Sequence, residues 1–409
     1  MSSKPMVDLI LTGATVIDPS QELYAVRDVA ITGDRIVELS EDIQAEAKQR
    51  IDLSGRILTP GFIDIHAHLY AGSTTWGIRF DALCLATGVT TVVDAGSSGW
   101  ANFWGFEENM VAHARTQTLA FVHISGIGLT FGPLGELEDI RYACPDRTAG
   151  IIKAWPETCV GLKIRMGRFQ LGDNGIAPLH LAVEAAEATN TPIMAHLGPG
   201  IDLPEVLRTL RPGDVVTHCY HDKGDDIFGD GDRILPAVWE ARERGVLFDV
   251  GHGGGSFSFD TAKRALAQDF TADVISTDLH SSSLEDPVMS LPETASKLLN
   301  LGVPLVGVVR QCTTGPAESI QRADELGTLR PGSVADLAAF ELQEGGQFEF
   351  RDVHDQLMVG PKNLSPVLTI RAGTIYDPDA LAGEREADRQ RALRMKALSH
   401  GDIETFLKG

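Results

Sequence analysis

The sequence predicts an α/β fold, a parallel (β/α)8 TIM barrel joined to a small β domain made from both ends of the chain. Three observations predict it. Short strand-like runs alternate with helical stretches after Pro60, period-2 runs flank that region, and side chains that bind metals end several of the runs. A (β/α)8 barrel gathers strand ends from the whole chain into one site, because its active site lies at the C-terminal ends of the strands.

The first 58 residues are predicted to form short strands joined by turns. Apolar runs at Leu9-Ile-Leu, Ala14-Thr-Val-Ile and Val29-Ala-Ile are separated by Thr12-Gly13 and Asp18-Pro19. Period-2 runs broken by Gly, Asp and Pro are typical of small antiparallel hairpins. We therefore assign residues 1–58 to the small β domain.

After Pro60 the pattern changes to strands that alternate with helices. Helical stretches such as residues 179–188 and 236–244 lie between the apolar runs. Strands separated by helical patterns imply right-handed crossovers and a parallel sheet. The eight predicted strands of this barrel, which we assign to residues 59–324, lie at 62–66, 90–94, 119–123, 160–164, 192–196, 215–218, 246–250 and 273–278.

The C-terminal part returns to short strands after a helical stretch at residues 291–300. Residues 327–340 and 365–376 again combine apolar runs with Gly, Pro and Asp. We assign residues 325–382 to the same small β domain as the N-terminal segment, which makes that domain discontinuous. The tail, residues 383–409, is rich in Glu, Arg and Lys and is predicted to form a C-terminal helical arm.

Composition argues against several classes of partner. The chain of 409 residues has 57 acidic and 35 basic residues, whereas nucleic acids and anionic membranes attract clustered Lys and Arg. Five cysteines without a C-x-x-C pair argue for a reducing compartment. The N-terminus has no apolar h-region, and no apolar run approaches the ~20 residues of a membrane helix. We expect a cytoplasmic protein that acts on a small molecule. The oligomeric state stays open, with a homo-oligomer as one alternative.

His66 and His68 lie two residues apart at the end of the first predicted barrel strand. Side chains at this spacing project from the same face of a strand, and paired imidazoles suit Zn, Fe or Mn. They belong to the specific string Pro-Gly-Phe-Ile-Asp-Ile-His-Ala-His. The alternative is a pair of polar residues at the mouth of the barrel.

Further candidate metal ligands end later strands. His196 and His218 follow apolar runs, and the alternative for each is a core histidine with a satisfied hydrogen bond. His221 competes with His218, but strand alternation puts it on the opposite face. Asp278 ends the last predicted strand. A carboxylate that touches a metal ion and its water can take the proton of that water and return it to the leaving group. The alternative for Asp278 is an ordinary turn aspartate.

These motifs resemble those of the amidohydrolase superfamily. Residues 60–68 look like its motif on the first strand. The family's later ligands, on strands five, six and eight, are similar in order and spacing to His196, His218 and Asp278. The flanking β segments resemble its second domain, so the likeness spans nearly the whole chain. Within the superfamily, the chain is most similar to the dihydroorotase-like group often labelled amidohydrolase/deacetylase.

The resemblance implies a centre of two divalent ions, with zinc expected, bridged by a carboxylated lysine. Lys163 has the matching position on the fourth strand. A lysine near cations and a dense histidine cluster should have a lowered pKa. Its neutral amine would then react with CO2 to give the bridging carbamate. The alternative is a one-metal site in which Lys163 pairs with Asp278.

Three residues are candidate substrate contacts. Arg165 lies two residues beyond Lys163 on the same strand face, and arginine is the natural bidentate partner of a carboxylate. Tyr70 lies where the resemblance implies a carboxylate-binding arginine in dihydroorotases. His252 lies among glycines that allow a ligand to come close. The alternatives are a salt bridge at the rim for Arg165 and a loop hydrogen bond for His252.

We therefore predict a metal-dependent hydrolase, a binuclear amidohydrolase that cleaves an amide or ester bond of a small acylated carboxylate in the manner of a deacetylase. A hydroxide between two ions would attack the acyl carbon, with Asp278 as the proton shuttle. One alternative is a cyclic amidohydrolase of the dihydroorotase or hydantoinase type, although Tyr70 departs from the dihydroorotase pattern. Another is a non-catalytic scaffold, but the chain retains all six candidate ligands, namely His66, His68, Lys163, His196, His218 and Asp278.

Overall fold

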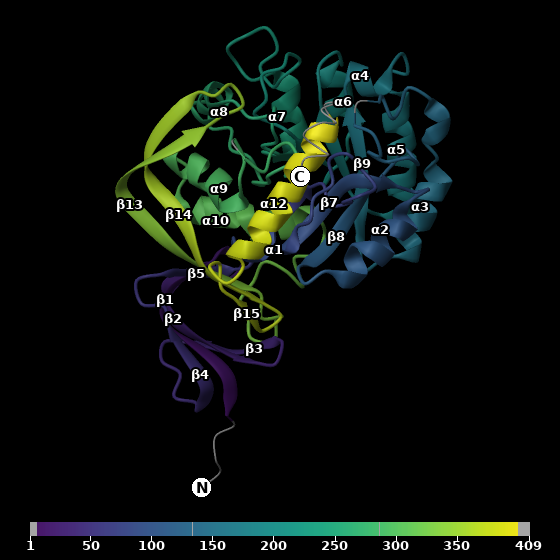
Figure 1. Cartoon of the computed structure of the whole chain (residues 1–409). Coiled ribbons are helices and arrows are strands. Elements are labelled where there is room, and N and C mark those ends of the chain that lie inside the picture. Colours follow the sequence, from purple (N-terminus) through teal and green to yellow (C-terminus); the bar gives the residue numbers. More distant parts are fainter. Residues whose placement is uncertain (1–5, 133, 286, 400–409) are drawn as a thin grey trace.

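A parallel sheet and a separate mixed sheet organise the computed structural model, which describes residues 6–132, 134–285 and 287–399. Helices surround the parallel sheet, and the N-terminal strands of the mixed sheet lie at one end of the molecule (Figure 1). The chain is thus a mixed α/β protein, as the alternating pattern predicts.

The parallel sheet holds seven strands in their order along the chain. Every neighbouring pair is parallel. All residues of the strand at Val89–Gly99 are buried, because helices cover parallel strands on the outside and side chains fill the inside. The seven strands are β6 (Phe62–Ala67), β7 (Val89–Gly99), β8 (Gln117–His123), β9 (Cys159–Met166), β10 (Ile193–Leu197), β11 (Val215–Thr217) and β12 (Leu247–Asp249).

The predicted eighth strand, residues 273–278, is not a regular strand. Isolated parallel bridges join Asp249 to Val274 and Ala67 to Leu279. The segment 274–279 therefore connects the last strand of the parallel sheet to the first. Near the end of this segment, Asp278 has a φ of 49°, which interrupts the extended backbone at that residue.

The three helices that the sequence predicts between and after the strands are confirmed. They are α5 (Ala177–Thr189), α7 (Pro236–Glu243) and α9 (Leu291–Asn300). The side chain of Ser290 caps α9 by accepting from the amide of Glu293. The other helices are α1 (Asp81–Leu85), α2 (Phe103–Asn109), α3 (Pro145–Ala154), α4 (Arg168–Leu171), α6 (Leu203–Thr209), α8 (Phe259–Leu266), α10 (Leu305–Cys312), α11 (Thr314–Ser319) and α12 (Ala382–Ser399), with 3-10 turns η1 (Pro19–Gln21), η2 (Val111–His113) and η3 (Ile140–Tyr142).

The mixed sheet combines both ends of the chain. Its strands are β1 (Val7–Asp18), β2 (Leu23–Thr32), β3 (Arg35–Ser40), β4 (Ala47–Asp52), β5 (Ile57–Pro60), β13 (Leu337–Arg351), β14 (Leu357–Arg371) and β15 (Thr374–Tyr376). The predicted antiparallel hairpins are confirmed for β1–β2 and β2–β3. They are wrong for β4 and β5, which both pair with β1 in parallel.

The turn predicted at Thr12-Gly13 is instead a β-bulge within the single strand β1. The register between β1 and β2 shifts between Leu11 and Ala14. Gly13 takes a φ of 71°, which glycine adopts without strain, and its amide donates to Asp28 at 3.0 Å. The bulge separates the half of β1 that pairs with β4 from the half that pairs with β5, so one long strand supports both.

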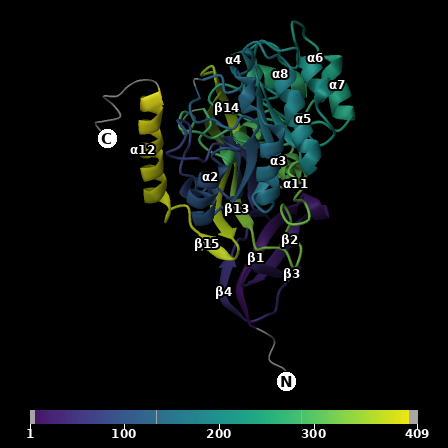
Figure 2. The ribbon, with the colours of Figure 1, turned by 90° about the vertical axis from the view of Figure 1, so that its right-hand side faces the viewer.

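Two C-terminal elements lie against the helical part of the molecule. The hairpin β13–β14 extends beside α9 (Figure 1), where the side chain of Asn300 donates to the carbonyl of Lys362 at 2.7 Å. The helix α12 lies on the outside (Figure 2), where Arg389 pairs with Glu285 at 2.9 Å. The predicted arm is confirmed as a helix as far as Ser399, and its residues 400–409 lie outside the described residues. Within the described ranges, no helix has the length and apolar character needed to cross a membrane.

Candidate active site

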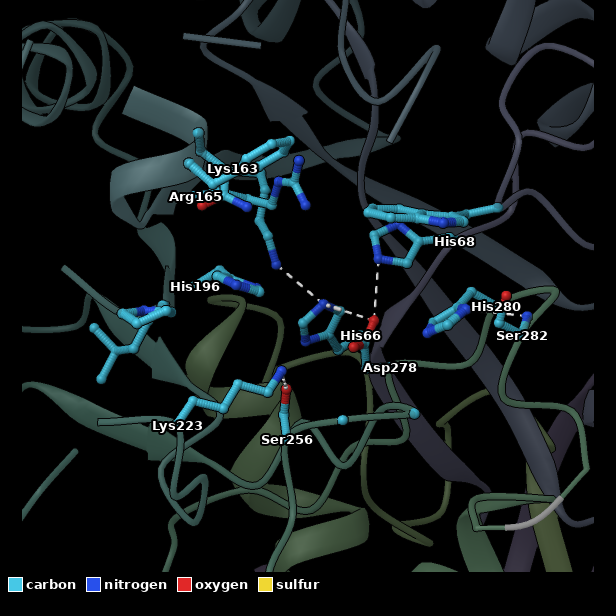
Figure 3. Close-up of a pocket in the computed structure, with 18 residues that line it drawn as sticks. His66, His68, Lys163, Arg165, His196, Lys223, Ser256, Asp278, His280 and Ser282 are labelled. Atoms are coloured by element: carbon cyan, nitrogen blue, oxygen red, sulfur yellow. Dashed lines mark hydrogen bonds and ion pairs between the residues drawn. The ribbon is translucent and has the colours of Figure 1, made fainter. Parts of the chain in front are cut away.

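A pocket of about 500 Å³ opens where the parallel strands end (Figure 3). The carboxyl ends of parallel strands are the usual place for ligands in α/β sheets. β6, β9, β10 and the segment 274–279 all contribute side chains. Six of the predicted site residues line the pocket, namely His66, His68, Lys163, Arg165, His196 and Asp278.

His66, His68 and Asp278 form a buried cluster in this pocket. The Nε2 atoms of His66 and His68 lie 3.3 and 3.0 Å from Oδ1 of Asp278. Burial holds the pKa of His66 well below its ordinary value, and the charge of Lys163 lowers it further. The neutral imidazole nitrogens and the carboxylate oxygen direct their lone pairs towards one point between them. This set of donor atoms suits zinc, iron or manganese. One ligand atom from each of the three residues lies within 4.8 Å of the others, as a shared cation requires.

Lys163 extends from β9 into the same cluster. Its Nζ atom lies 3.0 Å from Nε2 of His66, and the side chain is fully buried. Burial lowers the pKa of Lys163 to about 7, so much of the amine is neutral near neutral pH. Gly96 on β7 makes room for this side chain, because a Cβ at Gly96 would lie 2.5 Å from Cβ of Lys163. The one-metal alternative requires an ion pair between Lys163 and Asp278. Among the described residues, the ion pairs of Asp278 are with His66 and His68, and none joins it to Lys163.

His196 and His218 meet beside this cluster. Nδ1 of His196 lies 2.7 Å from Nε2 of His218. Burial lowers the pKa of His218 to about 3 and that of His196 well below its ordinary value. Nδ1 of His218 donates to the carbonyl of Gly251 at 2.6 Å, which leaves Nε2 of the neutral ring with a lone pair. Two ring nitrogens that face each other at this distance need a proton or a cation between them. His218 holds this position with a φ of 72°, a conformation that costs free energy and persists only where the surrounding structure fixes it.

A second row of side chains orients the rings of the first cluster. Nδ1 of His66 contacts Oγ1 of Thr217 at 2.9 Å, and Thr217 donates to Asp249 at 2.7 Å. Nδ1 of His68 contacts Oγ of Ser97 at 3.1 Å. Partners of this kind fix the tautomer of a metal-binding histidine, so that the other nitrogen faces the ion. Sequence periodicity does not reveal these partners, because they come from three different strands.

Arg165 lines the pocket, but its charge is already balanced. Its Nε and Nη2 atoms donate to the two oxygens of Glu136 at 2.8 and 2.6 Å. Both side chains are buried. Glu136 also lies 3.3 Å from Nε2 of His123. This geometry matches the salt-bridge alternative for Arg165, with the partner buried rather than at the rim.

Tyr70 and His252 do not reach the pocket. The hydroxyl of Tyr70 donates to the carbonyl of Asn102 at 3.3 Å. His252 stacks on Phe257 at 4.5 Å between ring centroids, and its Nε2 atom lies 3.0 Å from Nζ of Lys297. Neither is among the described residues that line the pocket. The glycine-rich loop after His252 still reaches it, through Gly254, Gly255 and Ser256.

Several lining residues have no assigned role in the sequence-based prediction. Trp76 and His280 lie side by side, with ring centroids 5.9 Å apart, and form an aromatic wall next to His68. Lys223 reaches into the pocket from the loop after β11 (Figure 3), and its Nζ atom lies 3.4 Å from Oγ of Ser256. Each comes from a loop without periodicity. The only signal was the position of these loops directly after strand ends.

Comparisons with known proteins agree with this geometry. Residues 258–376 match the family model described as "Amidohydrolase family". A deacetylase of Agrobacterium fabrum is 40% identical over 77% of this chain and 78% of its own length, and a deacetylase of Enterococcus faecalis is 34% identical over 86% and 95%. The crystal structure of an adenine deaminase is 32% identical with a TM-score of 0.85, covering 91% of this chain and 100% of its own. That of a dihydroorotase is 33% identical with a TM-score of 0.83, covering 90% and 99%.

Proposed function

Because this chain belongs to the amidohydrolase superfamily, and to its group of deacetylase-like members, we propose that it is a metal-dependent hydrolase that removes an acyl group from a small carboxylate. The bond cleaved is an amide or an ester. One observation carries the proposal, which is the buried cluster of His66, His68 and Asp278 at the strand ends, next to Lys163 and the pair of His196 and His218.

The donor atoms fit two divalent ions. His66, His68 and Asp278 would hold one ion, and His196 and His218 would hold the other. Zinc is the metal we propose, since it suits imidazole and carboxylate ligands, as iron and manganese also do. When bound, such ions polarise the acyl carbonyl and lower the pKa of water.

Lys163 would connect the two sets of ligands as a carbamate. Its neutral amine forms an N–C bond to CO2 and loses a proton, and the resulting group offers two anionic oxygens. The lowered pKa of the buried amine supports this step, because only the neutral form reacts. The position of Nζ beside His66 supports it as well.

Asp278 would carry the proton of the reaction. Burial alone would raise the pKa of Asp278, but His66 and His68 bring it well below its ordinary value, so the group is a carboxylate. Its oxygen accepts the proton of the attacking water and then gives it to the leaving group. The side chain of Asp278 lies against the two histidines, which keeps the proposed proton carrier at the site.

We also propose the domain organisation that suits this site. The parallel sheet would close as an eight-stranded barrel over residues 59–324, with the segment 274–279 as its eighth strand. Residues 1–58 and 325–382 would form the small β domain, and residues 383–409 the C-terminal arm. The five free cysteines support a reducing, cytoplasmic location.

Hydrolysis of a panel of substrates tests the proposed function. The purified enzyme, supplied with zinc and bicarbonate, should release acetate from O-acetyl and N-acetyl derivatives of small hydroxy and amino acids. Dihydroorotate should be a poorer substrate by kcat/KM. A preference for dihydroorotate by an order of magnitude would overturn the substrate assignment and support the second candidate, a cyclic amidohydrolase, which the similarity to a dihydroorotase structure favours.

A further inference from the structure

The Lys and Arg side chains that line the pocket differ in whether a carboxylate neutralises their charge. Arg165 is neutralised by Glu136 through two hydrogen bonds. Lys163 lies inside the histidine cluster and contacts His66. Lys223 is the remaining Lys or Arg of the lining. In the part of the chain that the structure describes, no carboxylate forms an ion pair with it.

The acidic neighbours of Lys223 in its own loop are engaged elsewhere. Asp222 contacts His354 at 2.7 Å, and Asp225 accepts from the amide of Gly200 at 2.7 Å. The contact that Lys223 makes in the pocket is the long one to the hydroxyl of Ser256, at 3.4 Å. An ammonium group in this situation has donors to spare for a ligand.

The glycine-rich loop after β12 is shaped around this ammonium. A Cβ at Gly255 would lie 3.0 Å from Nζ of Lys223, so a larger residue would press on it. Ser256 follows directly and presents its hydroxyl to the same place (Figure 3). Lys223 lines the same pocket as His66, His68 and Asp278, which puts its ammonium within reach of a small substrate bound at the histidine cluster.

We propose that Lys223, together with Ser256, binds the carboxylate of the substrate and thereby selects acylated carboxylates over uncharged esters and amides. This inference rests on the proposed function and assigns the anchor to a residue other than Arg165, Tyr70 or His252. One ammonium and one hydroxyl supply donors for the two oxygens of a carboxylate. A single positive charge suits a monoanion better than a phosphate dianion, which usually recruits several cations or backbone amides.

The test compares paired substrates in the zinc-loaded enzyme. Each acetylated hydroxy or amino acid is paired with its carboxamide, for example O-acetylglycolate with O-acetylglycolamide. Lys223→Met should lower kcat/KM for the carboxylates by about 10- to 100-fold, the value of one hydrogen bond to a charged group. It should leave the carboxamides nearly unchanged. Lys223→Arg should keep most of the preference.

Controls separate this inference from the proposed function. Lys153→Met makes the same change on the exposed face of α3 and should leave both substrate classes unaffected. An equal effect of Lys223→Met on carboxylates and carboxamides would overturn the assignment, as would an unchanged preference. If the unaltered enzyme hydrolyses no member of the panel, the proposed function fails instead. Calorimetric titration with lactate then still tests the anchor, because equal affinity in the enzyme and in Lys223→Met would refute it.

Discussion

Burial prepares individual residues of this site for binding a cation. A histidine binds a metal only through a bare nitrogen, and burial holds His66, His196 and His218 in their neutral forms. The same burial brings the pKa of Lys163 to about 7. One physical cause, removal from water, therefore gives both the proposed ligands and the proposed carbamate their reactive states.

Replacement of Lys163 by Ala tests the bridging role of this lysine. Loss of a partner that merely orients a metal ligand typically costs 10–100-fold in activity or metal affinity, so loss of a bridging ligand should lower kcat at least ~10²-fold. Metal content should fall as well, and short carboxylic acids should restore part of the activity by filling the vacated space. Full activity with both ions retained would show that Lys163 is not the bridge.

Replacement of Asp278 by Asn tests the proton carrier. Asn keeps the shape of the side chain and tolerates the positive φ at this position, but it lacks a basic oxygen. General bases contribute about 10²–10⁴-fold, so kcat should fall by that factor. Asp355→Asn is a matched control, because Asp355 has a similar φ of 57° in an exposed turn. Elemental analysis of both variants is needed, since the interpretation holds only where the metal is retained. An unchanged kcat with metal bound would refute the role.

At the scale of elements, a glycine on β7 makes room for the side chain of Lys163 on β9. Gly96 on β7 has a φ of 80° and touches the side chain of Lys163, whereas Gly55 has a φ of 78° with open space around its Cα. Gly96→Ala and Gly55→Ala therefore carry the same backbone cost, about 1–2 kcal/mol. Only Gly96→Ala should in addition displace Lys163 and lower kcat. Urea unfolding and kcat measured on both variants check this expectation. Equal losses of stability and no loss of kcat would mean that β7 does not position the lysine.

At the scale of the whole molecule, the proposed ions would hold the junction between the two ends of the parallel sheet. His66 lies in the first strand and His68 directly after it, and Asp278 belongs to the segment that reaches this strand by isolated bridges. Protein purified without chelator should contain close to two ions per chain. Chelation should lower the Tm, because a ligand at 100 times its Kd stabilises a fold by about 2.7 kcal/mol.

Hydrogen exchange locates this effect within the chain. After chelation, amides of residues 274–280 and of β6 should exchange faster, while those at the centre of β8 change little. A Tm that does not respond to chelation or to added zinc, together with metal content near zero, would contradict the prediction and support a scaffold without catalysis.

The sequence by itself determined the features that depend on residues close together along the chain. Alternating strands and helices, the pair His66-x-His68 and the later candidate ligands at strand ends follow from short-range periodicity, and the family resemblance drawn from them is confirmed. The N-terminal hairpins were only partly predictable. The parallel pairing of β4 and β5 with β1 depends on a bulge at Gly13 that spacing does not distinguish from a turn.

Only the tertiary structure decided which side chains face the pocket and which of them keep an unbalanced charge. Strand alternation places Arg165 correctly in the pocket, but Glu136 comes from a loop 29 residues earlier and takes up its charge. His252 turns into the core towards Lys297, which lies 45 residues later. Lys223 enters the pocket from a loop without periodicity. The charge balance of a pocket and the course of its loops depend on contacts between residues that are far apart in the sequence. Local sequence periodicity does not predict such contacts, because they form only when the chain folds.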